Sequence, residues 1–429
     1  MSKDNPQHAL VPRLRFPEFR DAPGWPQAPL GAALTERGQK SDGVSEVHSV
    51  SLSKGIVPQV EHMGRSFAAS DTSHYNLVRP FDIVYTRSPL AIFKLGIVKQ
   101  HKGENNAIVS PLYGVFEPRN QHLGLIVEAF FESPARSVRY LDPLAQKGAK
   151  NTIQLSNERF LSGSLCLPDD EDEQRKVAEC LGSLDDLIAA EGRKLAALRD
   201  HKQGLMQQLF PREGETQPRL RFPEFQNAGD WNLGRCRDVA KVLQGYGFPE
   251  KHQGNTEGTY PFYKVSDISN AIENGQRAIS DANNYIDDEV LKVLRAKTVP
   301  RGTVIFAKIG EAIRSDRRVV TTRPAVIDNN TAGVKALKGK CSDAFLFYLW
   351  SNVSLIDHAG GVVPAVSKTS LENVPLSYPP EPSEQQHIAD CLLSLDARIA
   401  AQVEKLDALR THKRGLMQQL FPSPEDIEA

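Results

Sequence analysis

The residue types that usually carry catalysis occur in this chain, but few of them stand at catalytic spacings. Ser110-Pro111-Leu112-Tyr113 is only a faint match to the two-proline tetrapeptide that positions an amino group for methyl transfer. Gly245-Tyr246-Gly247 is an equally weak match to a glycine-rich cofactor loop. The acids and the lysine within 169–176 resemble a nuclease cluster, although acidic residues there fit the start of a helix better. These patterns do not predict a catalytic site.

Nucleotide and metal sites are not predicted either. The sequence contains no G-x-x-x-x-G-K-[ST] phosphate loop, and its 11 histidines show no H-E-x-x-H or comparable metal spacing. The 5 cysteines are scattered and never form a C-x-x-C pair, which is typical of reduced thiols in a cytoplasmic protein. Neither a signal peptide nor an apolar run long enough to cross a bilayer is present. We therefore expect a cytoplasmic protein that is not itself an enzyme and holds no metal or cofactor.

Basic residues are the remaining candidates for chemistry. The net charge of −1 argues against a protein that coats nucleic acid indiscriminately, but local clusters can still bind it. Lysine and arginine outnumber acids in the windows 79–102 and 292–323, where they could neutralise phosphates or read base edges. The alternative for any such run is a solvated surface. The predicted DNA-binding residues are Arg79, Arg87, Lys94, Lys99, Lys102, Lys308, Arg314, Arg317, Arg318 and Asn329.

An internal repeat organises the elements that would position these residues. RLRFPEF occurs at 13–19 and again at 219–225, and a tryptophan follows each copy. Segments 173–211 and 384–422 also match, and both end in GLMQQLFP. The stretches between these constant segments are only faintly similar, although 83–85 aligns with 304–306, so that the two basic windows occupy equivalent places. This alternation indicates a duplicated scaffold that carries two diverged domains.

The constant segments predict two long helices with a shared apolar seam. Apolar residues recur at steps of three, four or seven for more than four heptads, which is typical of a coiled coil. Both seams are interrupted by polar residues at matching places: Glu191 and Lys202 in one, Gln402 and Lys413 in the other. We expect the helices to pair with each other, and the alternative is that each packs on its own domain. The predicted seam residues are Leu181, Leu184, Ile188, Leu195, Leu198, Leu392, Leu395, Ile399, Leu406 and Leu409.

The sequence predicts an α+β fold: two pseudo-symmetric globular α/β DNA-recognition domains separated by two long helices in an antiparallel coiled coil. Short β-branched and aromatic runs, such as 82–86 and 303–307, predict mostly antiparallel sheets in each domain. The predicted order is a disordered N-terminus (1–11), domain 1 (12–170), helix 1 (171–211), a linker (212–218), domain 2 (219–382), helix 2 (383–422) and a tail (423–429).

The repeated letters resemble the specificity subunits of Type I restriction–modification systems. The RFPEF segment with its following tryptophan, the helix start EQ-x-x-x-A-x-C-L-x-S-L-D and the helix end GLMQQLFP carry this resemblance, each in duplicate. It implies two target-recognition domains that each read one half of a bipartite, asymmetric site in double-stranded DNA. It also implies two modification subunits that methylate adenine with S-adenosylmethionine, and restriction subunits that use ATP and Mg²⁺. Those cofactors would belong to the partners, and no base contact transfers by motif.

Two other functions are compatible with parts of the sequence. A two-lobed coiled-coil scaffold would bind only proteins and show no sequence-selective DNA binding. A single-chain modification enzyme would transfer methyl groups without partners, although the motifs for that chemistry are missing.

Overall fold

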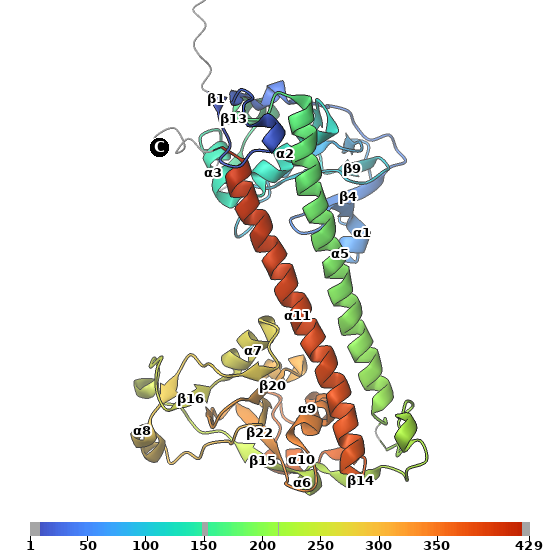
Figure 1. Ribbon diagram of the computed structural model, residues 1–429, viewed down its shortest axis with the longest axis vertical. Helices are drawn as coiled ribbons and strands as arrows, with labels where there is room; N and C mark the ends of the chain where they lie inside the picture. The colour runs from blue at the N-terminus through green and yellow to red at the C-terminus, as the bar shows by residue number, and fades with distance from the viewer. Residues whose placement is uncertain (1–8, 148–152, 213, 423–429) are drawn as a thin grey trace, which may run out of the picture. The chain divides into compact units, whose positions relative to one another are not determined.

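In the computed structural model of the chain, residues 9–147, 153–212 and 214–422 are described. The chain divides into two compact units: unit 1 is formed by 1–190 and 407–429, and unit 2 by 191–406. Each unit holds one globular domain together with part of each long helix (Figure 1). Because the units cut through the helices, they do not test the predicted domain limits, which remain predictions.

Unit 1 is built from short, mostly antiparallel strands. Its three-stranded sheet has the order β1 (Ala9–Leu10), β2 (Trp25–Pro29), β13 (Ser164–Cys166). The first four-stranded sheet has the order β3 (Leu34–Glu36), β10 (Gly114–Pro118), β7 (Ile83–Tyr85), β8 (Val98–Gln100). The second has the order β5 (Gly55–Pro58), β4 (Glu46–Ser51), β9 (Ala107–Val109), β6 (Asn76–Val78), and β11 (Gln146–Lys147) pairs with β12 (Ile153–Gln154).

Helices and aromatic rings close the core of unit 1. Its short helices are α1 (Gln59–Met63), α2 (Gln121–Phe131), α3 (Pro134–Leu141) and α4 (Asn157–Ser162). The ring of Phe160 on α4 stacks on Tyr85 of β7, with ring centroids 4.6 Å apart, and also on Phe116 of β10. Apolar residues of α2 pack on the same sheet, which fixes the strand ends that carry the predicted basic loop.

Unit 2 repeats this plan with a larger sheet. Its five-stranded sheet has the order β15 (Ala240–Gln244), β22 (Thr331–Ala336), β19 (Val304–Ala307), β20 (Arg318–Thr321), β17 (Ala278–Ile279). A three-stranded sheet has the order β18 (Tyr285–Ile286), β16 (Tyr260–Tyr263), β21 (Val326–Ile327), and β14 (Asn232–Arg235) pairs with β23 (Pro375–Tyr378). The helices are α6 (Cys236–Val239), α7 (Val265–Glu273), α8 (Asp288–Val293), α9 (Asp343–Ser351) and α10 (Lys368–Glu372).

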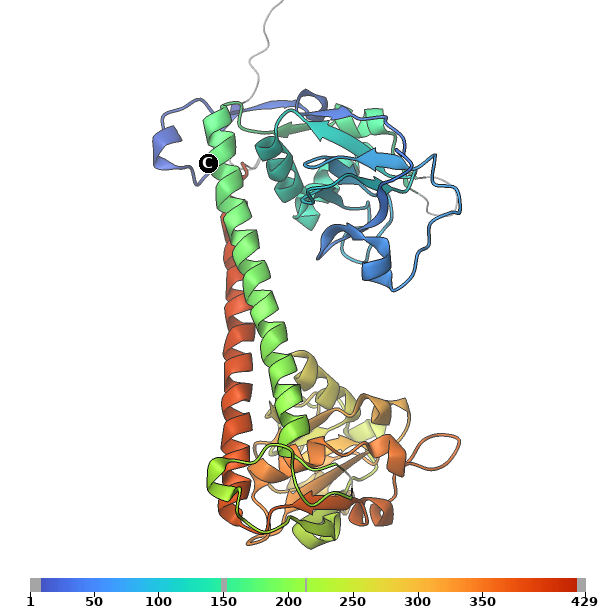
Figure 2. The ribbon, with the colours of Figure 1, turned by 90° about the vertical axis from the view of Figure 1, so that its right-hand side faces the viewer.

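The two long helices are α5 (Glu171–Leu209) and α11 (Pro382–Leu420), which run antiparallel within each unit (Figures 1 and 2). Within unit 1, Lys413 bonds Asp185, and within unit 2, Lys202 bonds Asp396. The later position on α11 thus meets the earlier position on α5, as expected for an antiparallel pair. Among the predicted seam residues, Leu181, Leu392, Leu395 and Leu406 are buried. The other six seam residues are partly buried.

The predicted fold class is confirmed: each unit is a mixed α/β domain, and long antiparallel helices run between the two domains of the sequence. Residues 1–8 of the predicted disordered N-terminus and the predicted tail 423–429 lie outside the described residues. Ala9–Leu10 differ from the prediction, because their backbone pairs with β2 as strand β1. The predicted strands 82–86 and 303–307 correspond to β7 and β19.

Candidate nucleic-acid interface and helix-pair grooves

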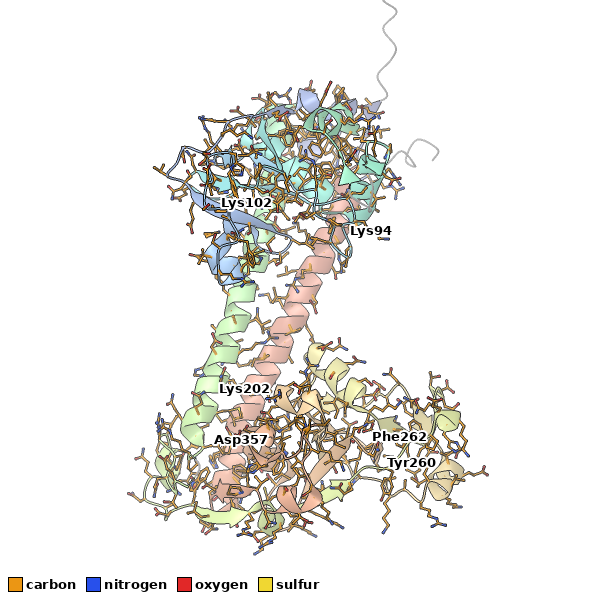
Figure 3. The ribbon with its side chains drawn as sticks, turned by 180° about the vertical axis from the view of Figure 1, so that it is seen from behind. Lys94, Lys102, Lys202, Tyr260, Phe262 and Asp357 are labelled. Carbon is orange, nitrogen blue, oxygen red and sulfur yellow. The ribbon has the colours of Figure 1, made fainter. Side chains whose placement is uncertain are left out.

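Three of the predicted DNA-binding residues of unit 1 lie exposed on the surface: Arg79, Lys94 and Lys102. Arg79 donates a hydrogen bond to Gln39 Oε1. Lys102 lies 3.2 Å from Glu128 and 3.8 Å from Asp185 of α5, and Figure 3 labels it together with Lys94. These three side chains could approach a phosphate backbone without leaving a buried position.

Arg87 and Lys99 are held by the protein itself. Arg87 Nε donates to the carbonyl of Leu155 at 2.7 Å, and its terminal nitrogens bond the carbonyl of Leu112 and Asn157 Oδ1. Lys99 is 7% exposed and lies 3.0 Å from Glu132 and 3.1 Å from Glu128. DNA contact by these two residues stays a prediction, and the geometry gives both a structural role.

The basic residues of unit 2 also divide into residues on the surface and residues held by the protein itself. Arg314 and Arg317 are on the surface and pair with Glu311 and Glu273, both at 2.9 Å. Arg318 is 6% exposed, and its guanidinium bonds the carbonyls of Asp316 and Val353, so it joins η6 (Glu311–Ser315) to the segment after α9. Asn329 is exposed in the turn between β21 and β22.

A polar cluster surrounds Lys308, at the end of β19. Lys308 Nζ donates to Gln244 Oε1 at 2.5 Å, and burial lowers the pKa of this lysine although Asp328 opposes the effect. Burial also raises the pKa of Asp328, whose carboxylate accepts from the backbone N–H of Asn330 at 3.0 Å. Gln244 Nε2 is buried without a hydrogen-bond partner within the described part of the chain. A buried amide donor without a partner, beside an ammonium and a carboxylate, is uncommon in a folded protein and marks this strand end as a candidate site.

Unit 1 has a polar chain at the equivalent strand end. Arg87 follows β7 as Lys308 follows β19, and each donates to a side-chain amide oxygen. Asn157, the partner of Arg87, in turn donates from Nδ2 to Glu36 Oε1 at 2.6 Å. Sequence analysis identified Arg87 and Lys308 but missed Gln244, Asn157 and Glu36. Only their position at strand ends and helix starts could have indicated them, and many polar residues share that position.

The repeated RFPEF letters build a buried ion pair in each unit. Arg15 donates from Nε and Nη2 to both carboxylate oxygens of Glu173, each at 2.7 Å, and Arg221 makes the same two bonds with Glu384. Each arginine also donates from Nη1 and Nη2 to two backbone carbonyls of its own loop. Each RFPEF loop is thus fastened to the first turn of the helix that follows its domain.

The repeated tryptophans and the GLMQQLFP ends complete the same joints. Trp25 packs edge-on against Phe421 at the end of α11, with centroids 6.2 Å apart. Trp231 packs against Phe210 at the end of α5, with centroids 6.1 Å apart. Each domain is therefore closed by the start of one long helix and by the end of the other.

The polar interruptions of the seam pair across the helices. Gln402 Nε2 donates to Glu191 Oε2 at 2.6 Å and to the Glu191 carbonyl at 3.0 Å, and these two positions are equivalents in the repeat. Two further repeat-related pairs are Lys202 with Asp396 at 2.5 Å and Lys413 with Asp185 at 2.6 Å. Buried polar pairs of this kind fix the register of a coiled coil.

Equivalent residues also line one groove in each unit, between the helix pair and the globular domain. The groove volumes are about 680 Å³ in unit 1 and about 840 Å³ in unit 2. Lys202 on α5, labelled in Figure 3, faces the unit 2 groove. The grooves share lining residues that are equivalent in the repeat. In each of the following pairs the unit 2 residue is named first: Arg199 and Arg410, Lys202 and Lys413, Met206 and Met417, Gln207 and Gln418, Asp396 and Asp185, and Ile399 and Ile188.

The described residues contain no group of three or more His, Cys, Asp or Glu side chains that could hold a metal ion. The described helices also include none that is long and apolar enough to span a membrane.

The fold and the duplicated joints define a class of protein: two diverged globular domains on a repeated helical scaffold. Residues 228–410 match the family model of the Type I restriction modification DNA specificity domain. This part of the chain, residues 228–410, is therefore similar to the DNA specificity domain of type I restriction–modification systems.

Two specificity subunits from Methanocaldococcus jannaschii are similar in sequence. A chain described as the type I restriction enzyme MjaX specificity subunit is 24% identical over 284 residues, which cover 64% of this chain and 62% of that protein. The type I restriction enzyme MjaIX specificity subunit is 22% identical over 235 residues, which cover 50% of each chain. The matches thus span between half and two thirds of these relatives.

Solved structures share the fold. The S subunit of a Type I restriction–modification system from M. genitalium has a TM-score of 0.58 at 10% identity, covering 96% of this chain and 100% of that one. A chain from a study of assembly and conformational transition in the type I R-M system has a TM-score of 0.51 at 18% identity, covering 93% and 98%. At these identities the likeness shows the fold alone.

Proposed function

We propose that this chain reads a bipartite, asymmetric site in double-stranded DNA and directs the methyltransferase and restriction subunits of a Type I complex to it. The observation that carries this proposal is the specificity-domain match together with a polar cluster at the equivalent strand end of each unit. Two constant joints that hold two diverged domains suit a protein that reads two different half-sites.

In unit 2, the cluster around Lys308 would read one half-site. Lys308, which is partly exposed, can donate to guanine, while Gln244, whose Nε2 is buried, and the buried Asp328 would hold the lysine in position. In unit 1, the chain of Glu36, Asn157 and Arg87 would serve the other half-site. The exposed residues Lys94, Lys102 and Arg314 would contact phosphates, which adds affinity without sequence information.

The paired grooves support two copies of one partner, since equivalent lining residues present similar chemistry twice. We assign these surfaces to two modification subunits. S-adenosylmethionine would be bound by those subunits, and ATP and Mg²⁺ by the restriction subunits, whereas this chain would supply no catalytic group.

The test is selection from a random duplex pool by the purified complex of this chain with its neighbouring methyltransferase. The proposal predicts recovery of a split motif with a fixed spacer, whereas recovery of unselected sequence would contradict it. Gln244→Ala should relax selection in one half-site only. The control Arg314→Ala should weaken binding evenly across sequences, because it would remove a phosphate contact.

A further inference from the structure

Two adjacent valines stand at the tip of a hairpin loop in unit 2. Val362 is 104% exposed and Val363 is 62% exposed, in the segment between η7 (Leu355–His358) and α10. Figure 2 shows this orange segment projecting from unit 2. Single exposed apolar residues are normal on a protein surface, but two neighbours at a projecting tip have no packing role in the chain.

We propose that Val362 and Val363 form an apolar wedge that enters a groove of the DNA half-site held by unit 2. This inference rests on the proposed function, and it adds a base-contacting element that carries no charge. Apolar side chains contact thymine methyl groups in the major groove, and they press between base steps in the minor groove. Both surfaces are apolar faces of bases.

The wedge is held in a defined conformation. The backbones of Gly360 and Ala365 exchange two hydrogen bonds, at 3.0 and 3.1 Å, which close the hairpin beneath the valines. Gly361 has a φ of +92°, which lets the chain reverse at this point. Valine is also stiff about its first side-chain torsion, so contact with DNA would immobilise little additional freedom.

The hairpin is fastened to the loop that carries Lys308. The N–H of Val366 donates to the Lys308 carbonyl at 2.9 Å, and the N–H of Gly310 donates to the Pro364 carbonyl at 2.8 Å. Ile309 and Ala365 also form a bridge, so the hairpin continues the strand end that the proposed function assigns to a half-site. This continuity with the proposed base-reading cluster makes DNA, and not a second protein, the occupant expected at the tip.

Unit 1 has a pair of short strands at the equivalent place in the sequence. Strands β11 and β12 pair Gln146 with Gln154 and precede the cap Ser156, as the valine hairpin precedes the cap Ser367. The letters between β11 and β12 are Gly-Ala-Lys-Asn-Thr, and the tip residues themselves lie outside the described part of the chain. The apolar letters Val362 and Val363 thus have no counterpart in the letters of unit 1, as expected if the two domains meet different bases.

The experiment measures the affinity of the assembled methyltransferase complex for its selected duplex, with the chain carrying Val362→Ser and Val363→Ser. We expect about tenfold weaker binding, equivalent to about 1.4 kcal/mol. Leu233→Ser is the matched control, because Leu233 is 58% exposed on β14 of the same unit. The control should bind like the unchanged chain. Replacing thymine by uracil in the unit 2 half-site, and separately placing 2-aminopurine there, would distinguish methyl contact from insertion between base steps.

Unchanged affinity of the double variant, in a complex that still selects its motif, would overturn the wedge and leave the proposed function intact. Loss of the methyltransferase subunit from the variant complex, with DNA affinity retained, would also overturn it, because the tip would then be a protein contact. Failure of the unchanged complex to select any sequence would remove the proposed function, and the wedge with it.

Discussion

At the scale of single residues, the residues that are repeated in the sequence fasten each domain to the long helices. The unrepeated residues carry the candidate recognition chemistry. Arg15 and Arg221 each make four hydrogen bonds inside the protein, two to one glutamate and two to backbone carbonyls. Lys308 and Gln244 pair at a strand end of unit 2. Repeated identity therefore marks the contacts that both domains share, and divergence marks where the proposed recognition residues lie.

Removal of one buried arginine should destabilise its unit strongly. Arg221→Ala leaves Glu384, which is 1% exposed, as a buried charge whose remaining side-chain donor, among the described residues, is the Trp231 N–H. We expect the free energy of unfolding to fall by about 3–5 kcal/mol. Denaturant unfolding measures this loss. Arg410→Ala, which removes an exposed pair with Asp407, should cost less than about 1 kcal/mol, and equal losses in the two variants would contradict the account.

The pairing of Glu132 with Lys99 and Lys413 should make the stability of unit 1 depend on pH in the acid range. Burial acts to raise the pKa of Glu132, but Lys99 and Lys413 outweigh it and hold the pKa below its ordinary value. A lowered folded-state pKa contributes stability above the ordinary carboxylate pKa, and this contribution is lost as pH falls through the folded-state value. Lys413→Met should therefore move the acid unfolding of unit 1 to higher pH.

Hydrogen exchange at stepped pH, resolved by unit, measures this shift. The matched control is Lys202→Met, the repeat equivalent in unit 2, which pairs with Asp396 and does not contact Glu132. The control should leave the acid transition of unit 1 unchanged. An equal shift in both variants would mean that the long helices, and not the Glu132 network, set the transition.

At the scale of elements, the helix pair combines a seam with polar pairs at fixed positions. Leu181 and Leu392 pack with the tryptophan clusters of their own units, whereas Glu191 and Gln402 pair near the middle of the helices. Pairing between helices and packing on the domains therefore occur together, in different parts of the same seam. From the sequence, helix pairing and packing of each helix on its own domain were two alternative predictions.

Lengthening both helices should lengthen the unread spacer of the target. Four residues added after Gly192 and four after Val403 extend each helix by about 6 Å, at 1.5 Å per residue. Since base pairs rise by about 3.4 Å, the spacer should grow by about one to two base pairs. Methylation mapping reads the result. An insertion in only one helix serves as the control, because it should mismatch the seam and abolish activity. An unchanged spacer in the doubly extended variant would contradict a ruler role.

Elements were easier to predict from the sequence than side-chain environments. The strands at Ile83 and Val304 and both long helices follow from periodicity, which reflects burial directly. The burial of Lys99 and Arg318 could not be predicted, because it depends on Glu128, Glu132 and the Val353 carbonyl, which come from distant segments. An excess of basic residues in a stretch of sequence predicts a basic surface only when no acidic residue from another segment packs against it.

At the scale of the whole molecule, duplication gives a chain in which each half supplies a domain and one helix. Each unit takes the end of its helix pair from the other half of the sequence, as Trp25 with Phe421 and Phe210 with Trp231 show. The separation of constant joints from variable domains allows one domain to change while the scaffold stays the same.

Exchange of one domain should therefore change one half of the target. Replacing 232–374 by the equivalent segment of another specificity subunit should alter one half of the split motif and leave the other half and the spacer unchanged. Methylation mapping of the chimaera checks this expectation. Changes in both halves would show that the domains do not read DNA independently.

The central claim is that this chain supplies the sequence specificity of its complex. The most direct measurement is single-molecule sequencing for methyladenine in DNA from cells that express the neighbouring methyltransferase with and without this chain. The account predicts a split motif with a fixed spacer that disappears when the chain is deleted. Identical methylation in both cell lines would contradict it, and would leave a protein-binding scaffold as the function of the chain.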